Sequence, residues 1–507
     1  MNMKRLLCLV CAGLGGLGLQ ISVVNGALVK TSRPNVLFIA VDDLNDWVGC
    51  MKGHPQARTP NIDRLAARGV LFTNAHCAAP ACNPSRAAVF SGRMPHVTGV
   101  WSNRSERLER LYPQARLLPT VFSQAGYRTF GTGKLLHSGS KPFFDEYYSV
   151  EQRWSPLSKN AVKYTDEEQP TKGTDTPRHL AKDRRGRKVI LPLNRMPSDR
   201  KPDTQDGESF DWGPFDVPDV DFGDTQITNW AIERINQTHD KPMFLAVGYY
   251  RPHIPLWAPQ KYFDRFTDSP GCLPPVKEDD LDDLSPIARK WALEAVTAGS
   301  HATVVKYDQW QAAVEAYLAC VTYVDYEIGR LLDVLDSTGA SDNTAIVLWS
   351  DHGWHLGEKQ HWGKWTGWER STRVPLIVVP PRKQGSGFAP AGSRCHQPVS
   401  LIDMYPTLTD LCGIQPPRDL DGQSLVPQLR QLDRAKRQGA VTTFDPGNTT
   451  LRTEGWRYIR YDDGSEELYN LCQDPNEWDN LAGISQYQNK KNALREMLGT
   501  MEKGYSK

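Results

Sequence analysis

Asn35-Val36-Leu37-Phe38-Ile39-Ala40-Val41 is a continuous apolar run that ends at two adjacent carboxylates, Asp42 and Asp43. An unbroken apolar run of this length predicts a strand buried on both faces, as in a parallel sheet covered by helices. Four further runs have the same character, at residues 128–133, 243–247, 345–349 and 375–379. Lysines, histidines and carboxylates follow three of them closely. The chain therefore predicts a sheet whose polar chemistry lies just past the strand ends.

Helical segments separate these strands. They are predicted at residues 61–68, 85–91, 118–125, 225–236, 312–335 and 401–412. Ser400 is the predicted N-cap of the last one, with Asp403 in the capping-box position. This alternation predicts an α/β fold with a doubly wound, mixed but mostly parallel sheet flanked by helices. Ligands of such sheets bind beyond the carboxyl ends of the strands, so the polar residues are expected on one rim.

Three regions are predicted along the chain. Lys4 and Arg5 precede the apolar run 6–24, which predicts a signal peptide at 1–26 and export to the periplasm or the medium. An uncleaved membrane anchor is the competing interpretation of that run. Residues 27–439 are predicted to form the main α/β domain, with a long polar insertion at 151–215. Residues 440–507 are predicted to form a small α+β subdomain with antiparallel strands at 440–444, 457–461 and 467–470.

The bulk composition is that of an ordinary soluble globular protein. The 507 residues are 39% hydrophobic and 23% charged, and the formal net charge is +1. This balance gives no global reason to expect nucleic acid or an anionic membrane as a partner. Eight cysteines remain after residue 26 and none forms a C-x-x-C pair, so a zinc ribbon is not indicated.

Two polar pairs follow distant strands. Asp42-Asp43 comes after the first strand, and Asp351-His352 follows the run 345–349. Hard carboxylate oxygens suit Ca²⁺ or Mg²⁺, and His352 leaves room for a softer metal. Adjacent aspartates in one loop are often only turn formers or caps. The second pair at an equivalent strand end favours a divalent metal site.

Cys82-Asn83-Pro84-Ser85-Arg86 precedes a predicted helix, whose free N–H groups and dipole favour an anion. The alternative is a buried structural thiol. Lys134 and His137 are spaced i, i+3 and are expected to share a face of a helical turn, while His253 and Lys364 add a titratable group and a cation. Hydrolysis of a tetrahedral anionic ester needs a nucleophile, a metal and lysines to balance the negative charge, and histidines as acid and base.

The chain resembles the type I sulfatases of the alkaline-phosphatase-like superfamily, and within them most resembles the iduronate-2-sulfatase group. The resemblance runs from Asn35 to about Leu481. It is carried by VDDLNDWVGC, TPNIDRLAARGVLFTNAHC, ACNPSRAAVFSGR, GTGKLLH, GYYRPHIP, SDHGWHLGEKQHWGKW, RVPLIVV and ELYNLCQDPNEWDNLA.

The resemblance implies a role for each matching residue. Cys82 would be oxidised by a formylglycine-generating enzyme to formylglycine (3-oxoalanine), whose hydrate is the nucleophile, and Arg86 would hold that hydrate. Lys134 and His137 would contact the hydrate, with His137 as the base that releases sulfate. His253 and Lys364 would bind the sulfate ester, and one of them would protonate the departing sugar oxygen. The cation, usually Ca²⁺ with Mg²⁺ or another divalent ion as alternatives, would be held by Asp42, Asp43, Asp351, His352 and the modified Cys82.

The implied substrate is a sulfated carbohydrate. Four tryptophans near Lys364 (Trp354, Trp362, Trp365 and Trp368) are expected either to stack on a sugar ring or to pack, and His355 and Trp354 are candidate substrate contacts. The basic stretch 178–201 is either a solvated loop or a subsite for a polyanionic glycan. Two other functions stay open: a phosphomonoester or phosphonate hydrolase of the same superfamily, and a catalytically silent glycan-binding protein with an unconverted Cys82.

Overall fold

Strand β1 (Asn35–Val41) lies inside an eight-stranded sheet of order β16-β2-β15-β11-β1-β9-β4-β5. The computed structural model describes residues 33–114, 116–150, 156–157, 179–183, 185–196, 210–295, 299–382 and 387–505. The other strands of this sheet are β2 (Val70–Phe72), β4 (Arg128–Gly133), β5 (Glu146–Tyr148), β9 (Met243–Tyr249), β11 (Thr344–Ser350), β15 (Leu376–Val379) and β16 (Ser393–Cys395). β11, β1, β9, β4 and β5 run parallel, whereas β15 is antiparallel to both β11 and β2. The predicted mixed, mostly parallel sheet is confirmed.

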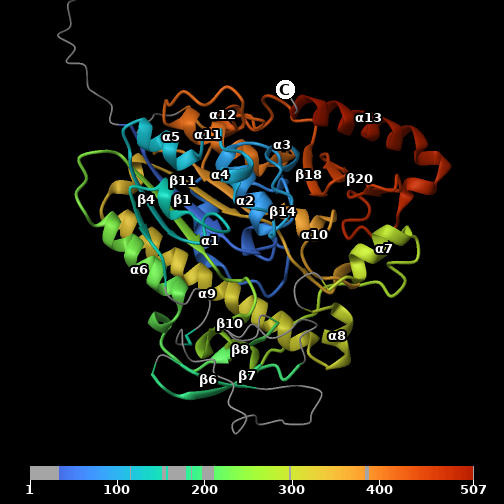
Figure 1. Cartoon of the computed structure of the whole chain (residues 1–507), viewed down its shortest axis with the longest axis horizontal. Helices are drawn as coiled ribbons and strands as arrows, with labels where there is room; N and C mark the ends of the chain where they lie inside the picture. Colours follow the sequence, from blue (N-terminus) through green and yellow to red (C-terminus); the bar gives the residue numbers. More distant parts are fainter. Residues whose placement is uncertain are drawn as a thin grey trace, which may run out of the picture. The chain divides into compact units, whose positions relative to one another are not determined.

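Helices cover both faces of the sheet, because alternate residues of each strand point to opposite sides. Leu37, Ile39 and Val41 pack into one core with α1 (Pro60–Ala66), α6 (Gly223–Ile235) and α9 (Trp310–Ser337). Val36, Phe38 and Ala40 pack into the other core with α2 (Cys82–Ser91), α5 (Leu118–Gln124) and α11 (Met404–Leu411). Figure 1 shows α6 and α9 together on one side of β1 and β4.

The predicted helices are present, with ends that differ by a few residues. The main difference is at 401–412, where a 3₁₀ turn over Leu401–Asp403 precedes α11 and carries the predicted capping box of Ser400 and Asp403. The shorter elements are α3 (Pro95–Thr98), α4 (Leu108–Leu111), α7 (Pro286–Leu293), α8 (His301–Lys306), α10 (Glu369–Thr372), α12 (Val426–Arg430), β3 (Ala75–His76), β12 (His355–Leu356), β13 (Trp362–Gly363), β14 (Arg373–Val374) and β17 (Val399–Ser400).

The C-terminal antiparallel sheet has four strands: β18 (Ala440–Asp445), β19 (Asn448–Arg452), β20 (Trp456–Arg460) and β21 (Glu466–Asn470). β19 was not predicted, because its sequence NTTLR lacks an apolar pattern although every residue in it is buried. The sheet and α13 (Gln488–Tyr505) share a core with Ala78, which precedes α2, with Ala88 inside α2 and with Met94, which follows it. The C-terminal strands therefore support the segment that carries Cys82.

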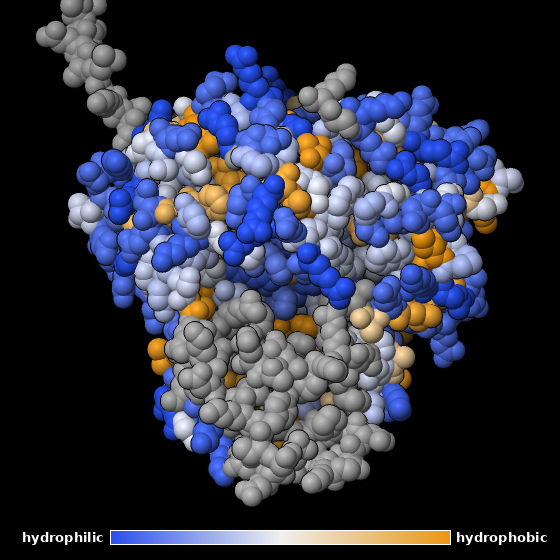
Figure 2. All heavy atoms as spheres, viewed as in Figure 1, coloured by the Kyte–Doolittle hydropathy of each residue, from blue (hydrophilic) through white to orange (hydrophobic). Residues whose placement is uncertain are grey.

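Only parts of the insertion 151–215 lie within the described residues. β6 (His179–Lys182) and β7 (Lys188–Leu191) form an antiparallel hairpin, and β8 (Trp212–Phe215) pairs in parallel with β10 (Leu256–Pro259). Of the basic stretch, Arg185 pairs with Asp221 and Arg187 with Asp183. The predicted signal peptide lies outside the described residues. Within them, no helix has the length and apolar character to cross a membrane, and the face shown in Figure 2 is mainly hydrophilic with scattered apolar residues.

Candidate active site

The two predicted metal-binding pairs lie side by side because their strands are neighbours. β1 and β11 run parallel with Val41 opposite Ser350, so the next residues of both strands leave the sheet together. Asp42, Asp43, Asp351, His352 and Cys82 each place one ligand atom within 4.8 Å of all the others. All five side chains are buried. The structure therefore contains a possible metal-binding cluster at the predicted rim.

Asp43 has a buried oxygen without a hydrogen bond, as expected of a cation ligand. Its backbone is left-handed, with φ 60°, and Tyr317 donates its hydroxyl to the Asp43 carbonyl at 2.8 Å. Oδ2 of Asp43 is buried and accepts no hydrogen bond from the described residues; His253 Nε2 lies 3.9 Å from it. A buried carboxylate oxygen without a donor is costly unless a cation satisfies it. The donor set therefore fits a hard divalent ion.

Arg86 holds the carboxylates in place from one turn inside α2. Its side chain is fully buried, with Nε 2.8 Å from Asp351 Oδ2 and Nη2 3.1 Å from Asp42 Oδ1. Nη1 donates to the carbonyl oxygens of Lys134 and Leu135. One planar guanidinium thus links the ends of β1, β4 and β11.

Cys82 is the first residue of α2, and a lysine ammonium and a histidine ring face its sulfur. Lys364 Nζ lies 3.0 Å and His352 Nε2 3.3 Å from Sγ. Burial opposes ionisation of the thiol, but the charges of Lys134, Lys364 and His352 outweigh burial and hold the pKa of Cys82 well below its usual value. The position favours an anionic or strongly nucleophilic group.

The pKa values of the two aspartates that contact Arg86 shift in opposite directions. Burial raises the pKa of Asp42, yet the ammonium of Lys134 and the guanidinium of Arg86 reverse this and hold it below its usual range. Lys134 donates to Asp42 Oδ2. Burial dominates at Asp351 and raises its pKa to about 7. A bound cation would lower the pKa of both carboxyl groups, because it stabilises their ionised forms.

His137 and His253 are the more exposed members of the site, and both are half-buried. Burial lowers the pKa of His137, and the neighbouring Cys82 partly opposes this shift. The predicted helical turn for Lys134 and His137 is wrong: residues 134–138 are bends, because Lys134 N continues the sheet by donating to Gly248 O at 2.8 Å. A cavity of about 230 Å³ is lined by Lys134 and His137, together with Ser138, Lys141 and Tyr147.

Trp354 and His355, the predicted substrate contacts, are each 1% exposed. The Lys364 ammonium lies 5.4 Å from the ring centroid of Trp354, and this cation–π contact helps to hold the lysine in position. His355 contacts Glu358 O and Thr366 Oγ1, both at 3.1 Å, and burial holds its pKa well below the usual value. Direct substrate contact by these two residues stays a prediction.

Several supporting residues were missed by the sequence reasoning. Ser85 donates to Asp351 O at 2.5 Å, and Ser350 accepts from Leu44 N at 3.0 Å and donates to His352 O at 2.9 Å. His361 contacts Ala292 O and Lys364 O, both at 2.8 Å, and so ties the Lys364 loop to the end of α7. Ser85 stood inside the Cys82 pentapeptide and could have been found there. His361 carries no comparable signal, because its partners are backbone carbonyls.

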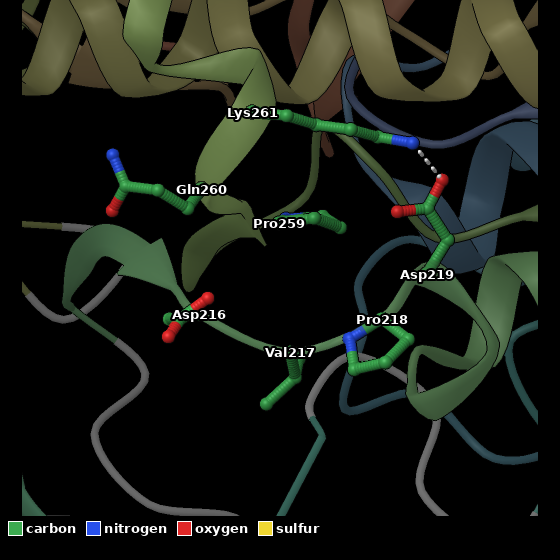
Figure 3. A pocket seen from close by; sticks show the side chains of 7 residues that line it. All are labelled: Asp216, Val217, Pro218, Asp219, Pro259, Gln260 and Lys261. Atoms are coloured by element: carbon green, nitrogen blue, oxygen red, sulfur yellow. Dashed lines mark hydrogen bonds and ion pairs between the residues drawn. The ribbon is translucent and has the colours of Figure 1, made fainter.

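A second hollow, of about 390 Å³, is formed by residues 216–219 and 259–261. Figure 3 shows its side chains, with Lys261 reaching Asp219 at 2.6 Å. None of the predicted site residues lines it.

Comparison with known proteins identifies the family of the chain. A sequence model of the sulfatase family matches residues 34–414. The chain belongs to the sulfatase family. A model of the C-terminal region of N-sulphoglucosamine sulphohydrolase matches residues 357–504 of this sulfatase. The sulfatase resemblance is confirmed, and the protein is a sulfuric ester hydrolase.

Several individual proteins are similar to this chain over most of its length. A sulfatase of Formosa agariphila is 37% identical over 476 residues, which cover 92% of this chain and 87% of that protein. Human iduronate 2-sulfatase is 30% identical over 450 residues, covering 80% and 75%. A solved phosphonate monoester hydrolase from Silicibacter pomeroyi has a TM-score of 0.72 at 23% identity, covering 93% and 96%. At that identity the likeness concerns the fold.

Proposed function

We propose that this sulfatase is exported and removes sulfate from a sulfated sugar, a 2-O-sulfated uronic acid or a related hexose, with a formylglycine made from Cys82. The observation that carries the proposal is the position of Cys82. It begins α2 inside the acidic cluster, with Lys364 Nζ at 3.0 Å. The similarity to iduronate 2-sulfatase supports the substrate class, and the apolar run 6–24 supports export.

The residues present fit both groups that the family uses. Asp42, Asp43, Asp351 and His352 would hold a divalent ion, with Ca²⁺ favoured by the oxygen ligands and the unpartnered Asp43 Oδ2. When bound, the ion polarises a sulfate oxygen as a Lewis acid, and a formylglycine hydrate supplies the attacking hydroxyl.

The lysines bind and orient the sulfate group. Lys364 and Lys134 are both nearly fully buried, and each contacts a cluster carboxylate, Asp43 and Asp42 respectively. Burial would lower the pKa of Lys364, but Asp43 and Cys82 outweigh burial and raise it, so its ammonium stays charged. Fixed cations in a site closed to water stabilise the charge that develops on sulfate oxygens.

The histidines move protons at the edge of the site. Burial lowers the pKa of His137, which favours the neutral imidazole, the form that accepts a proton from residue 82. His253 Nδ1 faces Ile254 O, which leaves Nε2 directed to the Asp43 side of the site. His253 or Lys364 then protonates the departing sugar oxygen.

The proposal is tested with a panel of sulfated saccharides that differ in ring and sulfate position, scored by free sulfate. Release from 2-O-sulfated uronic acids, and its loss in Cys82→Ala, is expected. Peptide mass analysis of residue 82 in the same preparation tests the aldehyde. A persistent thiol with tight glycan binding and no sulfate release would instead identify a silent glycan-binding protein.

Phosphonate monoester hydrolysis is the second candidate, favoured by the fold shared with the Silicibacter enzyme. Parallel assays with 4-nitrophenyl sulfate and 4-nitrophenyl phenylphosphonate separate the two. A higher kcat/KM for the phosphonate would overturn the choice of sulfate.

A further inference from the structure

The loop that carries Lys364 has an unusual backbone. Between Gly357 and Trp365, five residues are left-handed: Gly357, Lys359, Gln360, Gly363 and Trp365. The two glycines adopt this conformation freely, but side chains resist it, and a bulky residue such as Trp365 at φ 80° is an outlier. Strained residues of this kind gather at functional sites.

The side chains of the other two strained residues explain their conformations. Lys359 is buried, and its ammonium contacts Asp280 at 2.6 Å and donates to Glu477 O. Gln360 donates to Glu278 O at 3.2 Å. The indole of Trp365, in contrast, makes no hydrogen bond or aromatic contact with the described residues. Only its backbone is fastened, by Trp365 N donating to Pro80 O at 3.0 Å.

Trp365 also differs from the three tryptophans around it. Trp354, Trp362 and Trp368 are each 1% exposed and belong to the packed interior. Trp365 is half-buried. It directly follows Lys364, whose ammonium faces Cys82, and its backbone is bonded two residues before Cys82. The backbone of this half-buried residue is thus anchored beside both segments that form the sulfate site.

We propose that the indole of Trp365 is a platform for the pyranose ring that bears the scissile sulfate. This inference rests on the proposed function and names a residue that recognises the sugar. A pyranose presents an apolar C–H face, and an aromatic ring provides a flat apolar surface with a polar N–H edge. Lys364 and the cluster are proposed to hold the sulfate, and Trp365 is the next residue of the same loop.

The test uses Trp365→Ala and Trp365→Gly in the full-length metal-loaded enzyme, with Trp456→Ala as the matched control. Trp456 is also half-buried but packs on Tyr487 in the C-terminal region, with ring centroids 5.9 Å apart. KM is measured for a 2-O-sulfated heparin disaccharide. The inhibition constant of inorganic sulfate, which has no ring to stack, reports the sulfate subsite separately.

Loss of a stacking surface should raise KM for the disaccharide about five- to tenfold in both Trp365 variants. The inhibition constant of sulfate should not change, and Trp456→Ala should keep the wild-type KM. Tm of Trp365→Ala should stay within about 1 °C of wild type, and Trp365→Gly should melt at or above Trp365→Ala, because glycine tolerates the left-handed backbone.

A ring that merely packs would give the opposite pattern, with Tm falling by about 3 to 5 °C and an unchanged KM. That result, with sulfate release intact, overturns the role of Trp365 alone. Absence of sulfate release from every saccharide in the wild-type enzyme overturns the proposed function, and the platform with it.

Discussion

Arg86→Met should destabilise the fold as well as the site. Arg86 is fully buried and pairs with two buried carboxylates, Asp42 and Asp351. Removing one partner of a buried ion pair leaves uncompensated charge and costs about 3 to 5 kcal/mol. The folded unit runs from Arg33 to Lys507. At about 2.1 cal/mol/K per residue its unfolding entropy is about 1 kcal/mol/K, so Tm should fall by about 3 to 5 °C.

The measurement is thermal unfolding by circular dichroism in a chelator, so that a bound cation does not replace the lost guanidinium. Arg64→Met is the control, because Arg64 pairs with Asp333 at 2.6 Å with both side chains partly exposed and should cost under about 1 kcal/mol. Equal losses in the two variants would refute the assignment of Arg86 as the electrostatic link between the strand ends.

The pH dependence of this loss has a definite sign. Arg86 helps to lower the pKa of Asp42 in the folded state, so its stabilisation is present above the unfolded pKa of about 3.9 and is lost as pH falls through the folded value. The Tm difference between wild type and Arg86→Met should therefore be largest near neutral pH and shrink below about pH 4. A difference that grows on acidification would contradict the coupling.

Three further predictions concern the site. Ca²⁺ at about 100 times its Kd should raise the free energy of unfolding by about 2.7 kcal/mol, and Asp43→Asn should weaken this stabilisation. Calorimetric titration and thermal melting with and without a chelator measure both effects. An equal stabilisation of the variant by Ca²⁺ would remove Asp43 from the ligand set. Lys364→Met should lower kcat about 10² to 10³-fold, whereas Lys261→Met, at the hollow in Figure 3, should leave kcat unchanged; similar losses in both would contradict a local role. His361→Ala should lower kcat by releasing the Lys364 loop from α7, while calcium affinity stays that of wild type; a parallel loss of calcium binding would indicate general disruption of the site.

Much of the fold could be predicted because it depends on local patterns. The apolar runs at 35–41 and 345–349 became adjacent strands, and the helices covering them begin and end within a few residues of the predicted positions. β19 escaped prediction, since its threonines are buried by contacts from both sides rather than by an apolar pattern. The helical turn at Lys134 was wrong, since sheet pairing with Gly248 overrides the i, i+3 spacing.

The sequence determined which chemical groups the site contains and that they follow strand ends, because strand burial and helix starts depend on neighbouring residues. Only the tertiary structure decided how those groups meet. The register of Val41 with Ser350 joins Asp42-Asp43 to Asp351-His352, about 300 residues further along the chain, and the buried Arg86 pairs with Asp42 and Asp351. Trp354 and Trp365 lie in the same stretch of sequence but differ in burial: Trp354 is packed against the ammonium of Lys364, whereas Trp365 is half-buried. Such differences arise from long-range packing, which no local pattern encodes.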